Sequence, residues 1–455
     1  MKKGAVKAGR RISIFGMGYV GLVTAATFLR KGHAVVLIDV LKDRVEMVNR
    51  GRCPIFEPGV EKVLAKGVRA GRLEATMDGT AAVRSTDFSF ICVGTPSKAD
   101  GSIDLQHVKA VSRQIGRGLR SKRGYHVVVM KSTVVPTTTS EVVRPIIEKA
   151  SGRKAGRGFG LAVNPEFLKE GEALQDSTRP DRIVVGGLDE KSIETMLTIL
   201  KGFDAPIIMT DLGTAEMIKY ASNTFLAAKV ALSNEIANIC SAHGIDVYEV
   251  MKGVGLDKRI GPHFLRAGAG FGGSCFPKDL RALKRAAEKA KVKLSILPSI
   301  LDQNELQPLE TVKLLKGEHK GLRGKRIALL GLSFKPNTDD VRETRALPIA
   351  LALLKAGAVL KVYDPNRAAR DNFMGMLART KAKGRCKVCA SAHEALKGAD
   401  GAVIQTEARE FKSLEPRDLK RLMRRPVIVD GRRALDPHLM HKHGIIYRAI
   451  GWRNR

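Results

Sequence analysis

The sequence predicts an α/β protein in which two doubly wound parallel-sheet domains are joined by a central all-helical domain. Three observations support this prediction. Short β-branched runs alternate with helical stretches over residues 1–208, one long helix is indicated within 209–313, and the alternation returns over 314–455. Alternation of strands and helices is typical of a parallel sheet that is covered by helices on both faces. A chain of 455 residues is also long enough for about three domains.

The first domain is predicted from short apolar runs that end in glycine or polar residues. The segment 22–32 lies between the first two runs, has helical spacing and stops at a glycine. Strands are expected at 11–15, 34–39, 88–94, 126–132, 159–165 and 181–187.

The central and third domains follow from a change of pattern and its reversal. Residues 214–244 form one long helical pattern with a broad apolar stripe and small residues that permit close packing, and a further helix is expected at 278–290. Strand and helix patterns then return in 324–334, 346–365, 401–407 and 425–432.

The content and spacing of hydrophobic residues argue against a membrane-spanning protein. Hydrophobic residues make up 44% of the chain, and the apolar runs are shorter than the ~18 to 20 residues that a membrane span requires. The N-terminus is basic and then apolar, but glycines break the apolar part and a small-residue cleavage site is missing. We therefore expect a basic tail followed by the first strand, no membrane span and a location in the cytoplasm.

The formal net charge of +33 is high and would attract anionic ligands or surfaces. The Lys and Arg residues are scattered, aromatic residues are few and a nucleic-acid motif is missing, so nucleic-acid binding is not expected and a solvated basic surface is favoured. A basic polyanion-binding protein without catalytic activity remains an alternative. Six cysteines do not indicate a disulfide scaffold, and the C-x-x-C of Cys386 and Cys389 has no second pair to complete a metal site. Metal or redox use of that pair is the less favoured interpretation.

A cofactor site is predicted directly after the first strand. Gly16, Gly18 and Gly21 form G-x-G-x-x-G between a strand and a helix, and Asp39 ends the second strand. In a Rossmann-like domain these glycines permit the tight turn, the approach of the pyrophosphate and close helix–strand packing, while the acidic residue binds the ribose hydroxyls. Asp39 would repel a 2′-phosphate, so NAD is favoured, although Arg44 leaves NADP as an alternative.

A chemical site is predicted in "GAGFGGSCFPKDL", residues 268–280. Pro277 is typical of the first turn of a helix, so Cys275 would lie at a helix N-terminus, where the dipole stabilises a thiolate. Asp279 follows about one turn later and could act as a base or position a water. A cysteine nucleophile beside a hydride-accepting cofactor suggests that the thiol adds to an aldehyde, that hydride then leaves, and that water hydrolyses the resulting thioester.

These motifs together resemble the UDP-glucose/GDP-mannose dehydrogenase family of nucleotide-sugar dehydrogenases, from Arg11 to Arg433. The markers are "GMGYVG", "CVGTP", "KSTV", "NPEFLKEG", "IKYASN", "GFGGSCFPKD" and "FKPNTDDVRET". The resemblance implies NAD-dependent four-electron oxidation of a sugar C6 alcohol to a carboxylate through thiohemiacetal and thioester intermediates. It also implies that the middle domain forms the core of a homodimer or higher homo-oligomer. The use of the uronate product stays open between polysaccharide biosynthesis for a capsule, a glycan and a lipid modification.

The resemblance also implies roles for individual residues. Cys275 would be the nucleophile, Lys219 and Asn223 would stabilise the oxyanion or hold a water, Asp279 would orient water or accept a proton, Glu166 would be the base for thioester hydrolysis, and Glu170 would lie one helical turn from Glu166. Expected cofactor contacts are Gly16, Gly18, Tyr19, Val20, Gly21, Asp39, Arg44, Gly94, Thr95, Thr133, Glu170, Lys278 and Arg342, with Thr133 also reaching the reacting centre. Expected substrate contacts are Phe167, Leu168, Lys169, Glu170, Lys219, Asn223, Arg259 (from a partner subunit), Phe264, Gly272, Phe334, Lys335 and Arg432.

The substrate is predicted to be UDP-glucose, bound by the third domain. That domain has one glycine at its first strand end and lacks G-x-G-x-x-G, so it would take an anionic ligand other than a dinucleotide, with charge from Lys335, Arg342 and Arg432. These residues could equally be surface charges. Phe276 in "GFGGSCFPKD" is more typical of the UDP-glucose group than of the GDP-mannose group, which remains the alternative. Dehydrogenases of UDP-N-acetylhexosamines typically carry histidine where this chain has Ser274.

Overall fold

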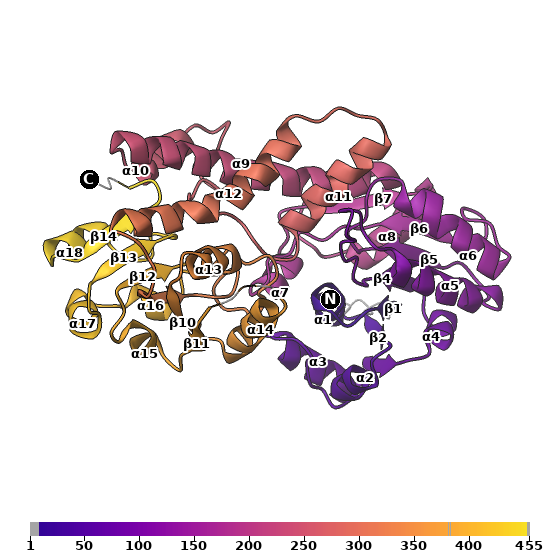
Figure 1. The fold of residues 1–455 in the computed structure, drawn as a ribbon. Helices are drawn as coiled ribbons and strands as arrows, with labels where there is room; N and C mark the ends of the chain where they lie inside the picture. The colour runs from indigo at the N-terminus through magenta and orange to yellow at the C-terminus, as the bar shows by residue number, and fades with distance from the viewer. Residues whose placement is uncertain (1–8, 381, 383, 453–455) are drawn as a thin grey trace, which may run out of the picture. The chain divides into compact units, whose positions relative to one another are not determined.

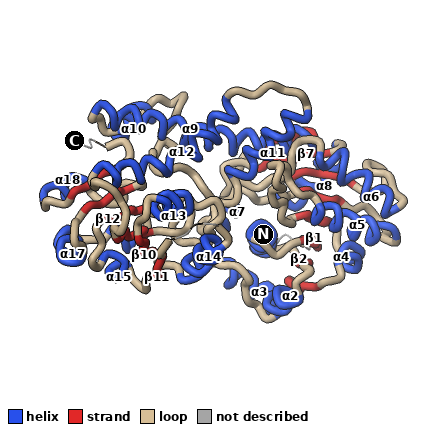
Figure 2. Tube along the Cα trace, viewed as in Figure 1, coloured by secondary structure: helices blue, strands red, loops and turns tan. Residues whose placement is uncertain are grey.

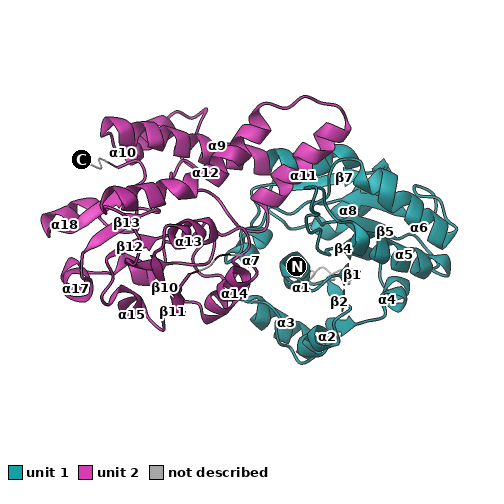
Figure 3. Cartoon of the chain, in the orientation of Figure 1, with its two compact units in different colours: residues 1–222 teal, residues 223–455 magenta. Residues whose placement is uncertain are grey.

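The chain forms two compact units, Met1–Ser222 and Asn223–Arg455 (Figure 3). The structure is a computed structural model that describes residues 9–380, 382 and 384–452, so the predicted basic tail at residues 1–8 lies outside the described part. The boundary between the units falls inside one long helix. The three-domain division at 1–208, 209–313 and 314–455 stays a prediction.

The first unit is built on an eight-stranded sheet with the order β3-β2-β1-β4-β5-β6-β7-β8 (Figure 1). The chain order reverses between β1 and β4, so a topological switch point lies between their carboxyl ends, which is where ligands bind in open α/β sheets. The strands are β1 (Arg11–Phe15), β2 (Ala34–Ile38), β3 (Leu73–Thr76), β4 (Phe88–Ile91), β5 (Val127–Met130), β6 (Gly160–Val163), β7 (Ile183–Gly187) and β8 (Ile207–Asp211).

Helices cover both faces of this sheet because its central strands are apolar on both faces. Ile12 and Ile14 of β1 pack with Leu22 and Phe28 of α1 in one core, while the alternate residue Phe15 is buried on the other face. The helices are α1 (Tyr19–Arg30), α2 (Lys42–Asn49), α3 (Val60–Arg69), α4 (Gly79–Ser85), α5 (Gln106–Arg120), α6 (Arg144–Ser151), α7 (Ala173–Thr178) and α8 (Glu190–Leu200), with a π-helical turn η1 (Thr139–Val143) before α6.

One strand pair departs from the predicted parallel arrangement. β6 and β7 pair antiparallel through Ala162–Gly187 and Val163–Gly186, whereas the other neighbouring strands of this sheet are parallel. The connection between β6 and β7 carries only the short helix α7, which packs on α1. A segment of this kind does not return the chain to the level where β6 begins, so β7 begins beside the carboxyl end of β6 and runs in the opposite direction.

The second unit is built on a six-stranded, wholly parallel sheet with the equivalent order β11-β10-β9-β12-β13-β14. Ile327 and Leu329 of β9 belong to one apolar cluster and Ala328 and Leu330 to another, so helices again cover both faces (Figure 2). The strands are β9 (Arg326–Leu330), β10 (Val359–Tyr363), β11 (Cys386–Val388), β12 (Gly401–Ile404), β13 (Val427–Asp430) and β14 (Ile446–Ala449). The helices of this sheet are α13 (Ala346–Lys355), α14 (Arg367–Ala378), α15 (Ala392–Leu396), α16 (Arg409–Lys412), α17 (Pro416–Leu422) and α18 (Pro437–Lys442).

A helical region lies between the two sheets in the chain. It consists of α9 (Leu212–His243), α10 (Val247–Gly255), α11 (Phe276–Lys289) and α12 (Ile296–Gly317). The long helix predicted at 214–244 is therefore confirmed as α9, and the predicted fold class of two parallel-sheet domains with a central helical region is confirmed. Among the described residues, none of the helices combines the length and the apolar character that crossing a membrane would need.

Candidate active site

The turn after β1 has the geometry that a dinucleotide needs. Gly16 has φ +105°, and a Cβ at Gly21 would lie 1.9 Å from the carbonyl oxygen of Gly16, so both positions exclude larger residues. Gly18 is the N-cap of α1, and an added Cβ there would meet none of the described atoms within 4 Å. The first turn of α1 receives no hydrogen bond from a side chain of its N-cap, so a pyrophosphate could accept its N–H groups.

Asp39 is held beside this turn. Its Oδ2 accepts a hydrogen bond from the Met17 N–H at 2.8 Å and its Oδ1 accepts one from the Leu41 N–H at 3.0 Å. The Arg44 Nη1 lies 3.9 Å from the same carboxylate. A fixed carboxylate at the end of the second strand fits the ribose hydroxyls of a dinucleotide.

The ends of β4 and β5 complete the cofactor side of the first unit. Thr95 donates its hydroxyl to the Thr133 carbonyl at 3.0 Å, which ties together the loops after these neighbouring strands. Gly94 leaves open space in the same way as Gly18. Tyr19 donates its hydroxyl to the Phe56 carbonyl at 3.0 Å, and Val20 packs against the core.

Glu166 and Lys219 form a buried ion pair in the first unit. The Lys219 Nζ lies 3.0 Å from the Glu166 Oε1, and the two residues are 4% and 8% exposed. Burial alone would raise the pKa of Glu166, but the charge of Lys219, the Leu168 N–H and the charge of Lys131 outweigh burial and lower it. Glu166 is therefore ionised at neutral pH and can accept a proton.

Lys131 is a further buried cation beside this pair. Its Nζ donates to the Asn164 Oδ1 at 2.9 Å and to the Asn164 carbonyl at 3.2 Å. Burial lowers the pKa of Lys131, opposed by Cys92 and Glu166. The residue lies in "KSTV" but is not among the residues predicted for the site.

The segment 164–172 was predicted to place Glu170 one helical turn after Glu166, and that prediction is wrong. The segment is irregular, and α7 begins only at Ala173. Its end is held by Glu57, which is 5% exposed and accepts the Gly171 N–H at 2.7 Å and the Ala173 N–H at 2.8 Å. The carboxylate thus satisfies two N–H groups at the start of α7. Within the segment, the Leu168 N–H donates to the Glu166 Oε2 at 2.6 Å and the Lys169 N–H to the Asp176 Oδ2 at 2.8 Å, in place of helical hydrogen bonds.

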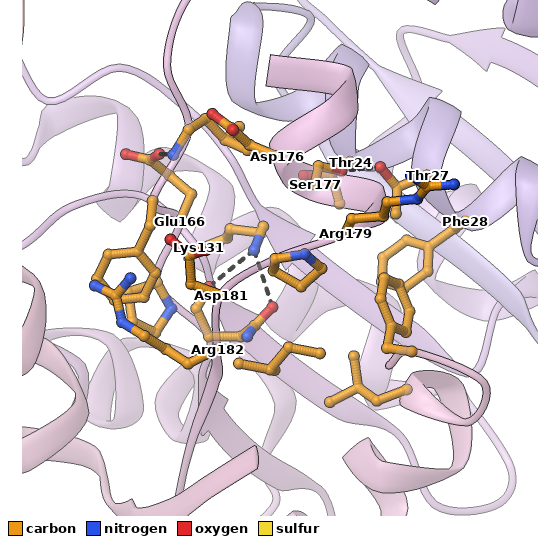
Figure 4. Close-up of a pocket in the computed structure, with 18 of the residues that line it drawn as sticks. Thr24, Thr27, Phe28, Lys131, Glu166, Asp176, Ser177, Arg179, Asp181 and Arg182 are labelled. Carbon is orange, nitrogen blue, oxygen red and sulfur yellow. Dashed lines mark hydrogen bonds between the residues drawn. The ribbon is translucent and has the colours of Figure 1, made fainter. Parts of the chain in front are cut away.

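A pocket of about 100 Å³ lies along this segment within the first unit. Figure 4 shows Thr24, Thr27 and Phe28 of α1 on one side of it and Lys131, Glu166 and Arg182 on the other. The residues Phe167, Leu168 and Lys169 of the predicted substrate segment also line it.

The ring of Phe167 contacts two cations. The Arg182 guanidinium lies 3.7 Å and the Lys219 Nζ 5.4 Å from the ring centroid. Cation–π contacts of this kind fix the ring and orient the backbone of the predicted substrate segment.

Cys275 is the N-cap of α11 and is exposed. The helix begins at Phe276 with Pro277 in its first turn, so the predicted helix start is correct. The Ser274 Oγ lies 3.7 Å from the Cys275 Sγ. Gly270 and Gly273 adopt φ +98° and φ +84° before the cysteine, which side chains other than glycine would disfavour.

The predicted Asp279 and Asn223 are in direct contact. Asn223 donates its Nδ2 to the Asp279 Oδ2 at 2.6 Å, and the Lys278 Nζ lies 2.5 Å from the Asp279 Oδ1. Asp279 is 1% exposed and donates its backbone N–H to the Cys275 carbonyl at 2.9 Å. The carboxylate is therefore anchored one turn from the thiol.

The loop before Cys275 is also held by two asparagines that were not predicted from the sequence. Asn234 of α9 accepts the Gly268 N–H at 2.8 Å. Asn304 of α12 accepts the Phe271 N–H at 2.7 Å and donates to the Phe271 carbonyl at 3.0 Å. The two helices thus fix the backbone that leads to Cys275.

The segment 334–344, after β9, contains the predicted nucleotide residues. The Lys335 Nζ lies 5.5 Å from the Phe334 ring centroid, and Arg342 forms a bidentate ion pair with Asp340 at 2.6 to 3.0 Å. A Cβ at Gly273 would lie 2.7 Å from the Phe334 ring, so this ring packs directly on the cysteine loop.

Arg432 links the same region to the end of β13. Its Nε donates to the Gln405 carbonyl at 2.9 Å and its Nη2 to the Gly270 carbonyl at 3.0 Å. The residue predicted to bind phosphates therefore also supports the cysteine loop. Gly272 lies in that loop as well, where a Cβ would come within 2.4 Å of the Glu343 carbonyl oxygen.

The remaining predicted residues lie on exposed loops of the second unit. Arg259 forms an ion pair with Asp257 at 2.7 Å and its side chain is 88% exposed. Phe264 has φ +64°, and its ring centroid lies 6.2 Å from that of Phe276.

Backbone strain marks the same regions. Apart from Lys291 after α11, the described residues other than glycine with left-handed backbone are Thr137, Phe264, Asn337, Glu343 and Arg433. Each lies in, or within a few residues of, a motif or a predicted contact. Strained residues concentrate at functional sites, because the surrounding structure must hold them in place.

The C-x-x-C lies in and just after β11, the edge strand of the second sheet. Cys386 and Cys389 are free thiols, and burial together with the charge of Cys389 raises the pKa of Cys386 to about 11. Within the described ranges, groups of three or more His, Cys, Asp or Glu side chains that could hold a metal ion are absent.

Comparison with known proteins agrees with this geometry. Residues 10–204, 213–306 and 328–437 match the NAD binding, central and UDP binding domains of the UDP-glucose/GDP-mannose dehydrogenase family. The chain is 42% identical over 446 residues to UDP-glucose 6-dehydrogenase AglM of Haloferax volcanii, covering 96% of this chain and 99% of the relative. It is 44% identical over 358 residues to GDP-mannose 6-dehydrogenase of Pseudomonas putida, covering 78% and 81%. A solved UDP-glucose dehydrogenase from Pyrobaculum islandicum superimposes with a TM-score of 0.90 at 40% identity, covering 99% of each chain. The chain belongs to the UDP-glucose/GDP-mannose dehydrogenase family.

Proposed function

We propose that this protein oxidises the C6 alcohol of UDP-glucose to the carboxylate of UDP-glucuronate, with Cys275 as the nucleophile. The observation that carries the proposal is the exposed Cys275 at the N-cap of α11, with the buried Asp279 anchored one turn away. The dipole of α11 favours the thiolate at this position. The overall reaction consumes one water and two NAD for each sugar.

NAD is the cofactor. The N–H groups at the start of α1, together with Gly16, Gly18, Gly21 and Asp39, would hold it in the first unit. When bound, NAD accepts a hydride in each of the two oxidation steps.

The first oxidation converts the C6 alcohol to an aldehyde. Cys275 then adds to C6, so that an S–C bond forms, the thiol proton leaves and an oxyanion develops. Lys219 supplies positive charge to that oxygen, and Asn223, held by Asp279, donates a hydrogen bond to it or to a water. Loss of the second hydride from this thiohemiacetal gives the thioester.

Hydrolysis of the thioester completes the reaction. Glu166 accepts a proton from the attacking water, the new C–O bond forms and the C–S bond breaks, which releases Cys275 as the thiolate. The ionised state of Glu166, maintained by Lys219 at 3.0 Å, supports this role. Asp279 orients the water or takes the second proton.

The sugar nucleotide is assigned to the segment 334–344, Arg432 and the irregular segment 164–172. Lys335 and Arg432 supply positive charge for the diphosphate, and Phe167 to Glu170 contact the sugar. GDP-mannose is the second candidate, because GDP-mannose dehydrogenases are relatives of similar identity. Those relatives match 78% of the chain, whereas the Haloferax UDP-glucose enzyme matches 96%, which favours UDP-glucose.

We also propose that the protein is a homodimer assembled through α9. Phe225, Leu232 and Ile239 are spaced by seven residues along this helix and are 73%, 60% and 55% exposed. An apolar stripe of this kind is typical of a helix that packs on a second copy. Arg259 would then reach the substrate of the partner. Location in the cytoplasm remains a prediction.

The test is to supply NAD with UDP-glucose, GDP-mannose and UDP-N-acetylglucosamine in separate reactions and to count the NADH formed per sugar consumed. Two NADH with UDP-glucose are expected, and Cys275→Ser should release no free acid above background. One NADH per sugar would mean that the reaction stops at the aldehyde and that the role of Cys275 is wrong. Two NADH with GDP-mannose alone would transfer the assignment to that substrate.

A further inference from the structure

Within the second unit, an ion pair joins α11, which begins directly after Cys275, to the segment 334–344, which we call the nucleotide segment. Arg281 of α11 donates its Nη1 to the Glu343 Oε1 at 2.6 Å and its Nη2 to the Glu343 Oε2 at 3.1 Å. Burial alone would raise the pKa of Glu343, but the hydrogen bond and charge of Arg281 outweigh it and lower that pKa. The pair is therefore ionised at neutral pH and bidentate, which fixes its orientation.

Glu343 is also strained and held by a second arginine. Its φ is +52°, a conformation that non-glycine residues adopt at a cost. The Arg345 Nε and Nη2 donate to the Glu343 carbonyl at 3.1 and 3.0 Å, and Arg345 is 3% exposed. The Arg345 Nη1 donates in turn to the Asn304 carbonyl at 3.3 Å, from the residue that clamps Phe271.

The backbone of the loop before Cys275, residues 268–274, packs directly against Arg342 and Glu343. A Cβ at Gly272 would lie 2.4 Å from the Glu343 carbonyl oxygen, so only glycine fits there. Gly273 donates its N–H to the Arg342 carbonyl at 3.0 Å. The loop before Cys275 and the segment 334–344 therefore cannot shift independently without breaking these contacts.

Lys335, a proposed ligand of the diphosphate, lies near the start of the same segment, and Glu343, which binds Arg281 of α11, lies near its end. Two functions assigned to different parts of the chain, nucleotide binding and thiol chemistry, thus meet at Glu343. Because these contacts are rigid, binding of the phosphates can change the position of Cys275 relative to the sugar.

We propose that Glu343 is a positioning residue that couples occupation of the nucleotide segment to the reactivity of Cys275. The proposal rests on the function proposed above, because it takes the ligand of the segment to be the UDP moiety. Glu343 acts through Arg281 on α11 and through its own carbonyl on Gly272.

The experiment measures the alkylation rate of Cys275 by iodoacetamide, resolved by peptide mass spectrometry, with and without UDP. UDP carries no sugar that could cover the thiol. In the unmodified protein we expect UDP to change the rate by about fivefold or more, the lower range of typical coupling between sites. In Glu343→Gln the affinity for UDP, measured by calorimetry, should stay within about twofold while the effect of UDP on the rate is lost.

Turnover provides a second measurement. Glu343→Gln should lower kcat with UDP-glucose by about tenfold and leave KM nearly unchanged, because misplacement of a reacting group affects the chemical step. Arg281→Lys keeps the charge and should retain an intermediate effect. Glu305→Gln is the matched control, since the Glu305 Oε1 lies 3.6 Å from the Arg281 Nη2 and its side chain is 55% exposed.

Retention of the full UDP effect in Glu343→Gln would overturn the proposal, as would an unmodified protein whose Cys275 does not respond to UDP. If Glu343→Gln does not fold, Arg281→Gln breaks the same pair from the other side, and the same outcomes apply. The alkylation measurement needs no turnover, so absence of NADH with UDP-glucose would refute the proposed reaction separately.

Discussion

The two sheets of this chain begin with the same local design. "RISIFG" at 11–16 and "RIALLG" at 326–331 each form a first strand that ends in a left-handed glycine, Gly16 with φ +105° and Gly331 with φ +92°. The N–H of each glycine donates to the last residue of the neighbouring strand, Ile38 or Tyr363. Asp39 and Asp364 then follow these strands and accept N–H groups of the turn.

The two units differ in the residues that follow these glycines, between the first strand and the first helix. In the first unit α1 begins at Tyr19, directly after Gly18, and leaves the N–H groups of its first turn to an anion. In the second unit Ser333 donates both its N–H and its hydroxyl to the Asp364 Oδ2, and α13 begins only at Ala346. The same strand order therefore leads to a glycine turn directly before a helix in one unit and to a long segment before the first helix in the other.

The interiors also differ. Ser13 of β1 faces Ser89 of β4 at 2.7 Å, and Ser89 bonds the wholly buried His126 at 2.8 Å. The equivalent neighbours in the second sheet are Ala328 and Ala402. The first sheet thus contains a buried polar network with a titratable histidine at positions where the second contains small apolar residues, and this network makes the core of the first sheet sensitive to acid.

The largest effect is expected when the open turn of the first unit is filled. Gly18→Asp places a carboxylate at the N-cap of α1, where it bonds the N–H groups that a pyrophosphate would use and repels the phosphates. We expect the Kd for NAD to rise by about 100-fold, or about 2.7 kcal/mol, with UDP binding unchanged. Calorimetry with each ligand checks this, and a change in NAD affinity below about threefold would contradict the site.

The two aspartates at the strand ends test the comparison directly. Asp39→Ala should weaken NAD binding by about tenfold, because the ribose loses a charged acceptor. Asp364→Ala should leave NAD binding unchanged and lower the free energy of unfolding by roughly 2 to 5 kcal/mol, because buried donors lose their acceptor. Thermal unfolding and NAD titration of both variants separate the two outcomes. Equal effects on NAD would show that the units are not functionally distinct.

Acid should destabilise the first unit through His126. Burial lowers the pKa of His126 from 6.5 to about 3, so the unfolded chain takes up a proton between these values and the folded chain does not. The stability due to this group is complete above about pH 6.5 and falls by about 1.4 kcal/mol per pH unit below it. Between pH 7.5 and 5 the loss should be about 2 kcal/mol.

The measurement is native-state hydrogen exchange of β1 and β5 peptides, which reports on the first unit alone. His126→Asn should be less stable at neutral pH but lose less protection on going to pH 5. An unchanged pH dependence in this variant would show that the network does not set the acid sensitivity.

The smallest effect concerns the choice between NAD and NADP. The Arg44 side chain is 39% exposed and lies 3.9 Å from Asp39, and exposed pairs of this kind contribute about 0 to 1 kcal/mol. Arg44→Ala should therefore change the Kd for NAD by less than about fivefold and should not create NADP activity. A large gain or loss with NADP in this variant would mean that Arg44, not Asp39, decides the cofactor.

Much of the architecture and several site positions could be predicted from local pattern. The glycine turn at 16–21 was predictable because larger side chains do not fit in it. A Cβ at Gly21, for example, would lie 1.9 Å from the Gly16 carbonyl oxygen. The start of α11 was predictable because Pro277 fits a first helical turn, and α9 because its apolar spacing persists over many turns. These signals depend on neighbours in the sequence.

The contacts that hold the site were not predictable in this way. Glu57 bonds Gly171 and Ala173, and Glu343 bonds Arg281, across long stretches of chain without a shared motif that specifies the pairing. The helical turn expected between Glu166 and Glu170 is replaced by bonds to side chains, since the Leu168 N–H donates to the Glu166 carboxylate at 2.6 Å and the Lys169 N–H to Asp176 at 2.8 Å.

The sequence by itself determined the fold class, the glycine turn, the long helix and the placement of Cys275 at a helix start, because periodicity and backbone sterics act over a few residues. Only the tertiary structure decided that Lys219 pairs with Glu166, that Asn304 and Asn234 hold the cysteine loop, and that Glu343 joins it to the nucleotide segment. Buried charges and backbone donors must find partners, and the packed fold, not the local pattern, decides which distant residue provides them.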